Sequence, residues 1–147
     1  MKKLLLLLIV LISNLSFAAN EKAIGFLLGN PTGLSGKYWL GDNKAIDAGL
    51  GFSFGKNNPL TLHSNYLFHK PESLYVNDEY PLDLYYGLGA RMKFSDDINL
   101  GVRFPLGVVY RVEKQNAEIF TELAPVLDLF SEFGLDLNLG LGARYYF

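Results

Sequence analysis

The chain contains no cysteine, and its 147 residues include only two histidines, two methionines and one tryptophan. The absence of cysteine excludes disulfide bonds, a thiol nucleophile, cysteine ligands for a metal and attachment of lipid to cysteine. If the protein is exported, its folded domain must therefore be stable without covalent cross-links.

Long apolar runs are also scarce, since the chain has only one, at residues 4–12. This run follows Lys2 and Lys3, precedes the small residues Ser16 and Ala18, and is too short to cross a bilayer as a helix. The pattern is typical of a secretory signal peptide, and we predict cleavage after residue 18. Residues 19–147 are then long enough for one domain with a single core.

An excess of positive charge is missing as well. Without the two lysines of the predicted signal, 11 of the 13 basic residues remain against 15 acidic ones, a net charge of about −4. This balance gives no reason to expect nucleic acid as a partner.

What the sequence does contain is alternation of apolar and polar residues, and it is clearest over residues 135–147. A period of two residues indicates a β-strand. Residues 82–94 repeat the pattern with nine of thirteen positions identical, through either duplication of a hairpin or convergence under the same constraint. We predict eight strands, with turn-forming residues between them and no helical period: 23–29, 34–40, 46–54, 60–69, 82–94, 98–104, 117–129 and 135–147.

Two closed architectures fit eight such strands, and the charged residues favour one of them. A soluble barrel would point its apolar face inward, whereas a membrane barrel would point that face toward lipid and would need matched charges inside. The polar face carries five cations and six anions, near balance. We therefore predict an all-β, eight-stranded, antiparallel up-and-down transmembrane β-barrel with this charge network in its lumen: Lys37, Asp47, Asp83, Arg91, Lys93, Arg103, Glu118, Glu122, Asp128, Asp136 and Arg144.

Catalytic and metal-binding patterns are weak in this chain. His63 and Ser64 are adjacent, so on a strand they point to opposite faces and cannot act as base and nucleophile. His63 and His69 would lie about 20 Å apart on one strand, and Glu118 and Glu122 about 13 Å apart. We therefore expect no enzyme activity, no metal and no cofactor.

The last alternating residues, Leu141, Ala143, Tyr145 and Phe147, end the chain on an aromatic side chain. They look like the signal that outer-membrane barrels present to their assembly machinery, and the chain after the signal peptide resembles the small OmpA/OmpX-like barrels. The segment Gly33-Leu34-Ser35-Gly36-Lys37-Tyr38-Trp39-Leu40 looks like one found in poorly characterised proteins of this type. The resemblance implies location in the outer membrane of a Gram-negative envelope, with lipid, periplasmic chaperones and the assembly machinery as partners. It implies no activity.

The function expected from these patterns is structural, namely stabilisation of the envelope by a barrel with a closed, charge-paired lumen. A narrow, porin-like pore for small solutes is the first alternative, and a soluble periplasmic barrel that binds an apolar ligand is the second. With both termini in the periplasm, the longest predicted connection, residues 70–81, would lie on the periplasmic side, although such barrels usually place their long loops outside. Oligomeric state and ligand are not encoded in any recognisable pattern.

Overall fold

The structure is a computed structural model, and it describes residue 3 and residues 22–41, 43–53, 59–129 and 134–147. The predicted signal peptide lies outside these residues apart from Lys3. Part of three predicted turns also lies outside them, as does Phe54, the predicted end of the third strand. None of the helices among the described residues is long and apolar enough to span a bilayer.

The described residues form nine β-strands and one short 3-10 helix, which makes the protein all-β. The elements in chain order are β1 (Lys22–Asn30), β2 (Thr32–Gly41), β3 (Lys44–Phe52), β4 (Leu60–Val76), β5 (Tyr80–Phe94), β6 (Ile98–Arg103), β7 (Leu106–Val112), η1 (Glu113–Gln115), β8 (Ala117–Asp128) and β9 (Gly134–Tyr146).

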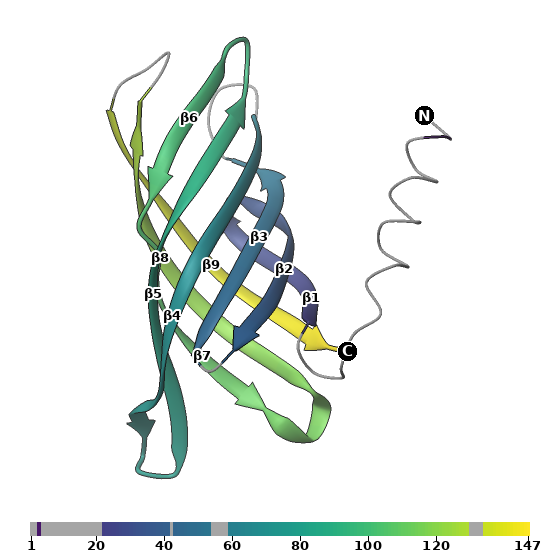
Figure 1. Cartoon of the computed structure of the whole chain (residues 1–147), viewed down its shortest axis with the longest axis vertical. Coiled ribbons are helices and arrows are strands. Elements are labelled where there is room, and N and C mark those ends of the chain that lie inside the picture. The colour runs from purple at the N-terminus through teal and green to yellow at the C-terminus, as the bar shows by residue number, and fades with distance from the viewer. Residues whose placement is uncertain (1–2, 4–21, 42, 54–58, 130–133) are drawn as a thin grey trace.

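The strands make one antiparallel, up-and-down sheet that closes into a ring (Figure 1). Each strand pairs with the next along the chain, apart from the short β6 and β7, and β1 pairs with β9, so the first and last strands lie side by side. Every pairing is antiparallel, as short connections between neighbours require. In a closed sheet of this kind no strand needs to be left as an edge.

The prediction of eight strands is wrong in number, because the structure has nine. The additional strand, β7, begins just after Pro105 and had not been predicted. β6 and β7 both pair with β5 on one side and β8 on the other, in an unbroken register, so together they occupy a single position in the ring. Proline has no N–H to donate to a neighbouring strand, which is why the strand is interrupted there.

The prediction of a long connection at residues 70–81 is also wrong, since most of these residues belong to strands. β4 continues to Val76 and β5 already begins at Tyr80. Asn77 and Asp78 form the turn with φ of 54° and 57°, a left-handed conformation that these two residue types tolerate. The resulting hairpin extends beyond its neighbours at the end of the ring where β1 begins and β9 ends (Figure 1).

Candidate functional site: the charged interior of the ring

The interior of the ring is polar, the reverse of an ordinary protein core. Of the residues that the structure describes, eighteen polar or charged ones are buried, against ten hydrophobic ones. The only hydrophobic cluster among the buried, described residues is small, and it includes Leu27, Leu67 and Phe120. Because side chains alternate across a strand, its two faces can differ in character. Among the described residues 30 large hydrophobic side chains are exposed, most of them on the outside of the ring.

The eleven residues predicted for the lumen lie in this interior or at its rim. Nine of them are buried, while Lys93 and Asp136 are half-buried. Each of the eleven takes part in at least one ion pair. The interior is therefore a set of paired charges contributed by strands that are far apart in the sequence.

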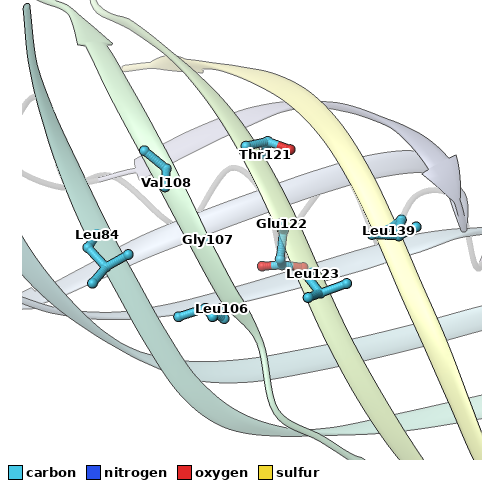
Figure 2. Close-up of a pocket in the computed structure, with 8 residues that line it drawn as sticks. All are labelled: Leu84, Leu106, Gly107, Val108, Thr121, Glu122, Leu123 and Leu139. Atoms are coloured by element: carbon cyan, nitrogen blue, oxygen red, sulfur yellow. The ribbon is translucent and has the colours of Figure 1, made fainter. Parts of the chain in front are cut away.

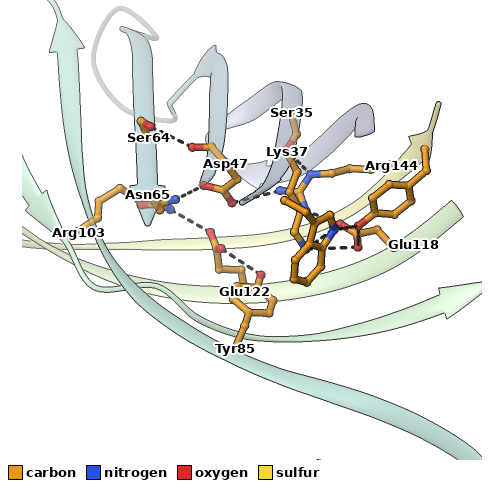
Figure 3. Close-up of polar contacts among 12 residues, drawn as sticks. Ser35, Lys37, Asp47, Ser64, Asn65, Tyr85, Arg103, Glu118, Glu122 and Arg144 are labelled. Atoms are coloured by element: carbon orange, nitrogen blue, oxygen red, sulfur yellow. Dashed lines mark hydrogen bonds and ion pairs between the residues drawn. The ribbon is translucent and has the colours of Figure 1, made fainter. Parts of the chain in front are cut away.

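Arg144 of β9 is the centre of the first cluster (Figure 3). One guanidinium nitrogen donates to Glu118 Oε1 at 2.8 Å, a second lies 3.2 Å from Asp47 Oδ2, and Nε donates to Ser35 Oγ at 2.9 Å. A planar guanidinium presents several donors in a fixed geometry, so one arginine can bridge β2, β3 and β8 in this way. Arg144 is only 4% exposed.

Glu118 has more partners than the arginine alone. Lys37 Nζ lies 3.4 Å from both carboxylate oxygens, and Tyr146 Oη donates to Oε2 at 2.5 Å. Trp39 in turn donates its indole N–H to Tyr146 Oη at 2.9 Å. Glu118 has no measurable exposure, so these donors replace the water that a carboxylate would otherwise need.

Arg103 is the centre of the second cluster. It pairs with Glu122 at 3.1 Å and donates to Asn65 Oδ1 at 3.0 Å. Asn65 Nδ2 donates to Asp47 Oδ1 at 2.6 Å, which connects this cluster to that of Arg144, and Tyr85 Oη donates to Glu122 at 3.0 Å (Figure 3). The two clusters therefore form one continuous hydrogen-bonded network.

Arg91 forms a third group, near the end of the ring opposite the β4–β5 hairpin. Its guanidinium nitrogens donate to Asp128 at 2.8 and 2.9 Å and to Asp136 at 2.8 Å, and Lys93 lies 3.6 Å from Asp136. Two carboxylates on one guanidinium, supplemented by a lysine, leave the group close to neutral.

Sequence reasoning missed Arg111, which pairs with Asp83 at 3.2 Å. Its strand, β7, had not been predicted, so its side chain could not be placed on either face. With Arg111 added, the set holds six cations and six anions. Asn65 was also missed. On the predicted strand 60–69 it shares a face with His63, opposite the face that carries Leu62 and Phe68, so the same period-two rule could have found it.

The histidines show no catalytic arrangement. His63 is buried in the interior, whereas the exposed Ser64 donates its hydroxyl to the backbone oxygen of Asp47. His69 lies between Trp39 and Tyr85, with ring centroids 4.5 and 5.1 Å away; its ring is tilted relative to Trp39 and stacked on Tyr85. Among the described residues no group of three or more histidine and carboxylate side chains could hold a metal ion.

Several buried polar atoms in the described interior have no hydrogen-bond partner in the protein. They are His63 Nδ1, both ring nitrogens of His69, Arg91 Nε, Asn99 Oδ1 and Asn138 Nδ2. Buried polar groups are generally hydrogen-bonded, and the usual partner for an atom like these is an internal water molecule. The interior is thus expected to contain water between its charged clusters.

The outer surface of the ring is as uniformly apolar as the interior is polar. Between the two rims of the ring, with β4 counted only as far as Phe68, the outward positions of the described strands carry no Asp, Glu, Lys or Arg. The serine and threonine side chains at these outward positions, Ser64 and Thr121, donate to the backbone oxygens of Asp47 and Gly140 on the neighbouring strands, at 3.1 Å each. Charged, exposed side chains such as Lys44, Lys70 and Asp96 lie at the rims of the ring, in the turns and on the β4–β5 hairpin.

The chain matches no family model, no curated protein and no solved structure.

Proposed function

We propose that this protein is an outer-membrane β-barrel whose lumen is closed by paired charges and whose role is to stabilise the envelope. The observation that carries the proposal is the inverted distribution of side chains in the described part of the chain, where 30 large hydrophobic residues are exposed and 18 polar or charged ones are buried. Soluble monomers rarely expose apolar patches larger than about 300–600 Å². In a bilayer the same surface would be covered by acyl chains.

The lengths of the strands suit this environment. A strand of about 9–11 residues, tilted by about 45°, crosses the hydrocarbon layer. β1 and β3 have 9 residues, β2 has 10, β8 has 12 and β9 has 13. β6 and β7 are shorter, but together they span one ring position of comparable length.

The hydrogen bonds made by outward hydroxyl groups also support a position in the bilayer. A hydroxyl that faces hydrocarbon has no water to bond, and an unpaired one costs several kcal/mol. Ser64 and Thr121 both donate to backbone oxygens of the adjacent strand. A surface in contact with water would not need these bonds.

The closed interior favours a structural role over transport. A ring of about eight strands leaves an interior just wide enough for side chains to fill. Here Arg144 extends across that interior to Asp47 of β3 and Arg91 to Asp136 of β9. Arg103 reaches Asn65 of β4, on the far side of β5. A narrow water-filled pore is the second candidate, and the unpartnered atoms of His69 and Asn138 favour it because they call for water inside.

A soluble barrel that holds an apolar ligand fits less well. Such a protein needs apolar side chains around the ligand, yet the described interior is dominated by charged and amide groups. Its exterior would also have to face water with an almost uncharged surface.

The first experiment is fractionation of cells that express the full chain, with gel electrophoresis of the membranes with and without boiling. We expect recovery in the outer membrane and a band whose mobility changes on boiling. Leu50→Glu places a charge in the middle of the outward face and should abolish this behaviour, whereas Lys70→Glu, at an already charged position where the β4–β5 hairpin extends beyond β3, should not. Recovery of the wild type as a soluble periplasmic protein would refute the proposal.

Conductance separates the two roles. The purified protein is incorporated in a planar lipid bilayer, and the closed lumen predicts no discrete current steps. Reproducible steps from the wild type would replace the structural role with that of a narrow pore.

A further inference from the structure

A groove lies on the outer face of the ring, across β5, β7, β8 and β9 (Figure 2). Its volume is about 260 Å³, and its walls are the outward side chains of Leu84, Leu106, Val108, Leu123 and Leu139, with Thr121 beside them. A volume of about 150 Å³ is enough to hold benzene in an apolar cavity, so this groove is large enough for a segment of one hydrocarbon chain.

Gly107 and Glu122 form the floor of the groove. The glycine has no side chain, and a Cβ atom at this position would collide with the ring of Tyr85 and the backbone oxygen of Thr121. Tyr85 therefore supports the wall from inside, and its hydroxyl donates to Glu122 at 3.0 Å. Because Glu122 also pairs with Arg103, its carboxylate is already used by the interior.

The groove offers no free polar group to a ligand. The Thr121 hydroxyl donates to the backbone oxygen of Gly140, and the other wall residues are aliphatic. A sugar, a phosphate or a peptide backbone would lose its bonds to water here and gain none. The chemistry of the lining thus favours an apolar chain.

The wall next to the groove is weakly bonded. Phe104 donates its N–H to the backbone oxygen of Pro125 and Gly87 donates to that of Pro105, each at 3.0 Å. In an antiparallel pair of this kind the partner normally returns a bond, but neither proline has an N–H. The ring position that β6 and β7 share therefore lacks one backbone hydrogen bond to β5 and one to β8.

We propose that this groove is a binding site for a single acyl chain of a membrane lipid. The inference rests on the proposed function, because only a membrane barrel brings this face into contact with lipid. The missing ladder bonds let the wall at β7 adjust its width, so that one chain is held in the groove longer than chains elsewhere on the outer face.

The test uses the full protein in phospholipid vesicles that contain a phospholipid with a photoactivatable diazirine in its acyl chain. After irradiation, the labelled residues are located by mass spectrometry of peptides. We expect several-fold more label on Leu84, Leu106 and Leu123 than on Leu50 and Leu62, which are outward residues away from the groove.

Two matched variants assign the label to the groove. Leu106→Trp fills part of it and should lower labelling of Leu84 and Leu123 several-fold, while Leu50→Trp changes an outward residue of similar exposure and should not. Equal labelling around the whole outer face would overturn the site but leave the membrane barrel intact. Failure of the wild type to insert in the vesicles would overturn both.

Discussion

Replacement of Arg144 by leucine tests the charged interior most directly. The guanidinium bridges Glu118 at 2.8 Å, Asp47 at 3.2 Å and Ser35 at 2.9 Å. Leucine would keep the apolar stem but remove every donor. The two carboxylates, 0% and 2% exposed, would then have to be satisfied by what remains.

The two carboxylates are affected differently. Glu118 keeps Lys37 and Tyr146, whereas Asp47 loses its only direct ion pair among the described residues and keeps one hydrogen bond from Asn65. Removal of one partner of a buried ion pair costs about 3–5 kcal/mol, mainly because the other charge is left unpaired. We expect Arg144→Leu to lower the free energy of unfolding by that amount.

The assay is urea unfolding in lipid vesicles, followed through the fraction of protein that still shows the folded band on an unboiled gel. The double variant Arg144→Leu, Asp47→Asn removes the stranded charge together with the arginine and should recover a large part of the loss. It also keeps the test usable if the single variant does not fold.

Lys44→Leu serves as the control, since Lys44 is exposed at a strand end and its replacement should change stability by no more than about 0.5 kcal/mol. If Arg144→Leu falls within the same limit, Arg144 is in contact with water and the description of a closed, charge-paired interior is refuted.

Three further predictions concern the outer face, the lumen and the topology. Leu88→Arg puts a charge on the middle of the outward face and should cost about 2–4 kcal/mol in vesicles by the same gel assay, a loss that a water-exposed position would not show. Arg103→Ala combined with Glu122→Ala removes a charge pair that fills the interior, so current steps absent from the wild type should appear in planar bilayers; an unchanged trace would mean that this pair does not block the lumen. Because the chain has no cysteine, a single cysteine at Tyr75 in the β4–β5 hairpin should react with a membrane-impermeant maleimide only after the outer membrane is permeabilised, whereas one at Asp96 should react in intact cells, and the reverse pattern would invert the proposed orientation.

The strands and the division of their faces could be read from the sequence to a large extent. Alternation is a local property, so residues 135–147 identify a strand and show which side chains share a face without any knowledge of its neighbours. The observed β9, Gly134–Tyr146, agrees within one residue. Near-equality of charges on the polar face likewise pointed to paired ions.

The errors arose where pairing with other strands overrides local signals. Pro105 marks the end of a strand when the sequence is read alone, yet β7 continues beyond it because β5 and β8 supply partners on both sides. The polar residues 70–73 suggest a loop, but pairing between Leu74 and Leu82 and between Val76 and Tyr80 extends the hairpin.

The sequence by itself determined the period of two, and with it two faces of opposite character, because a strand's geometry sends successive side chains to opposite sides. Only the tertiary structure decided which charges meet. Arg144 of β9 reaches Asp47 of β3 across the interior, and Lys37 of β2 reaches Glu118 of β8, although 97 and 81 residues separate them. These two contacts depend on the register of every strand between the partners and on closure of the ring. No local sequence pattern contains either.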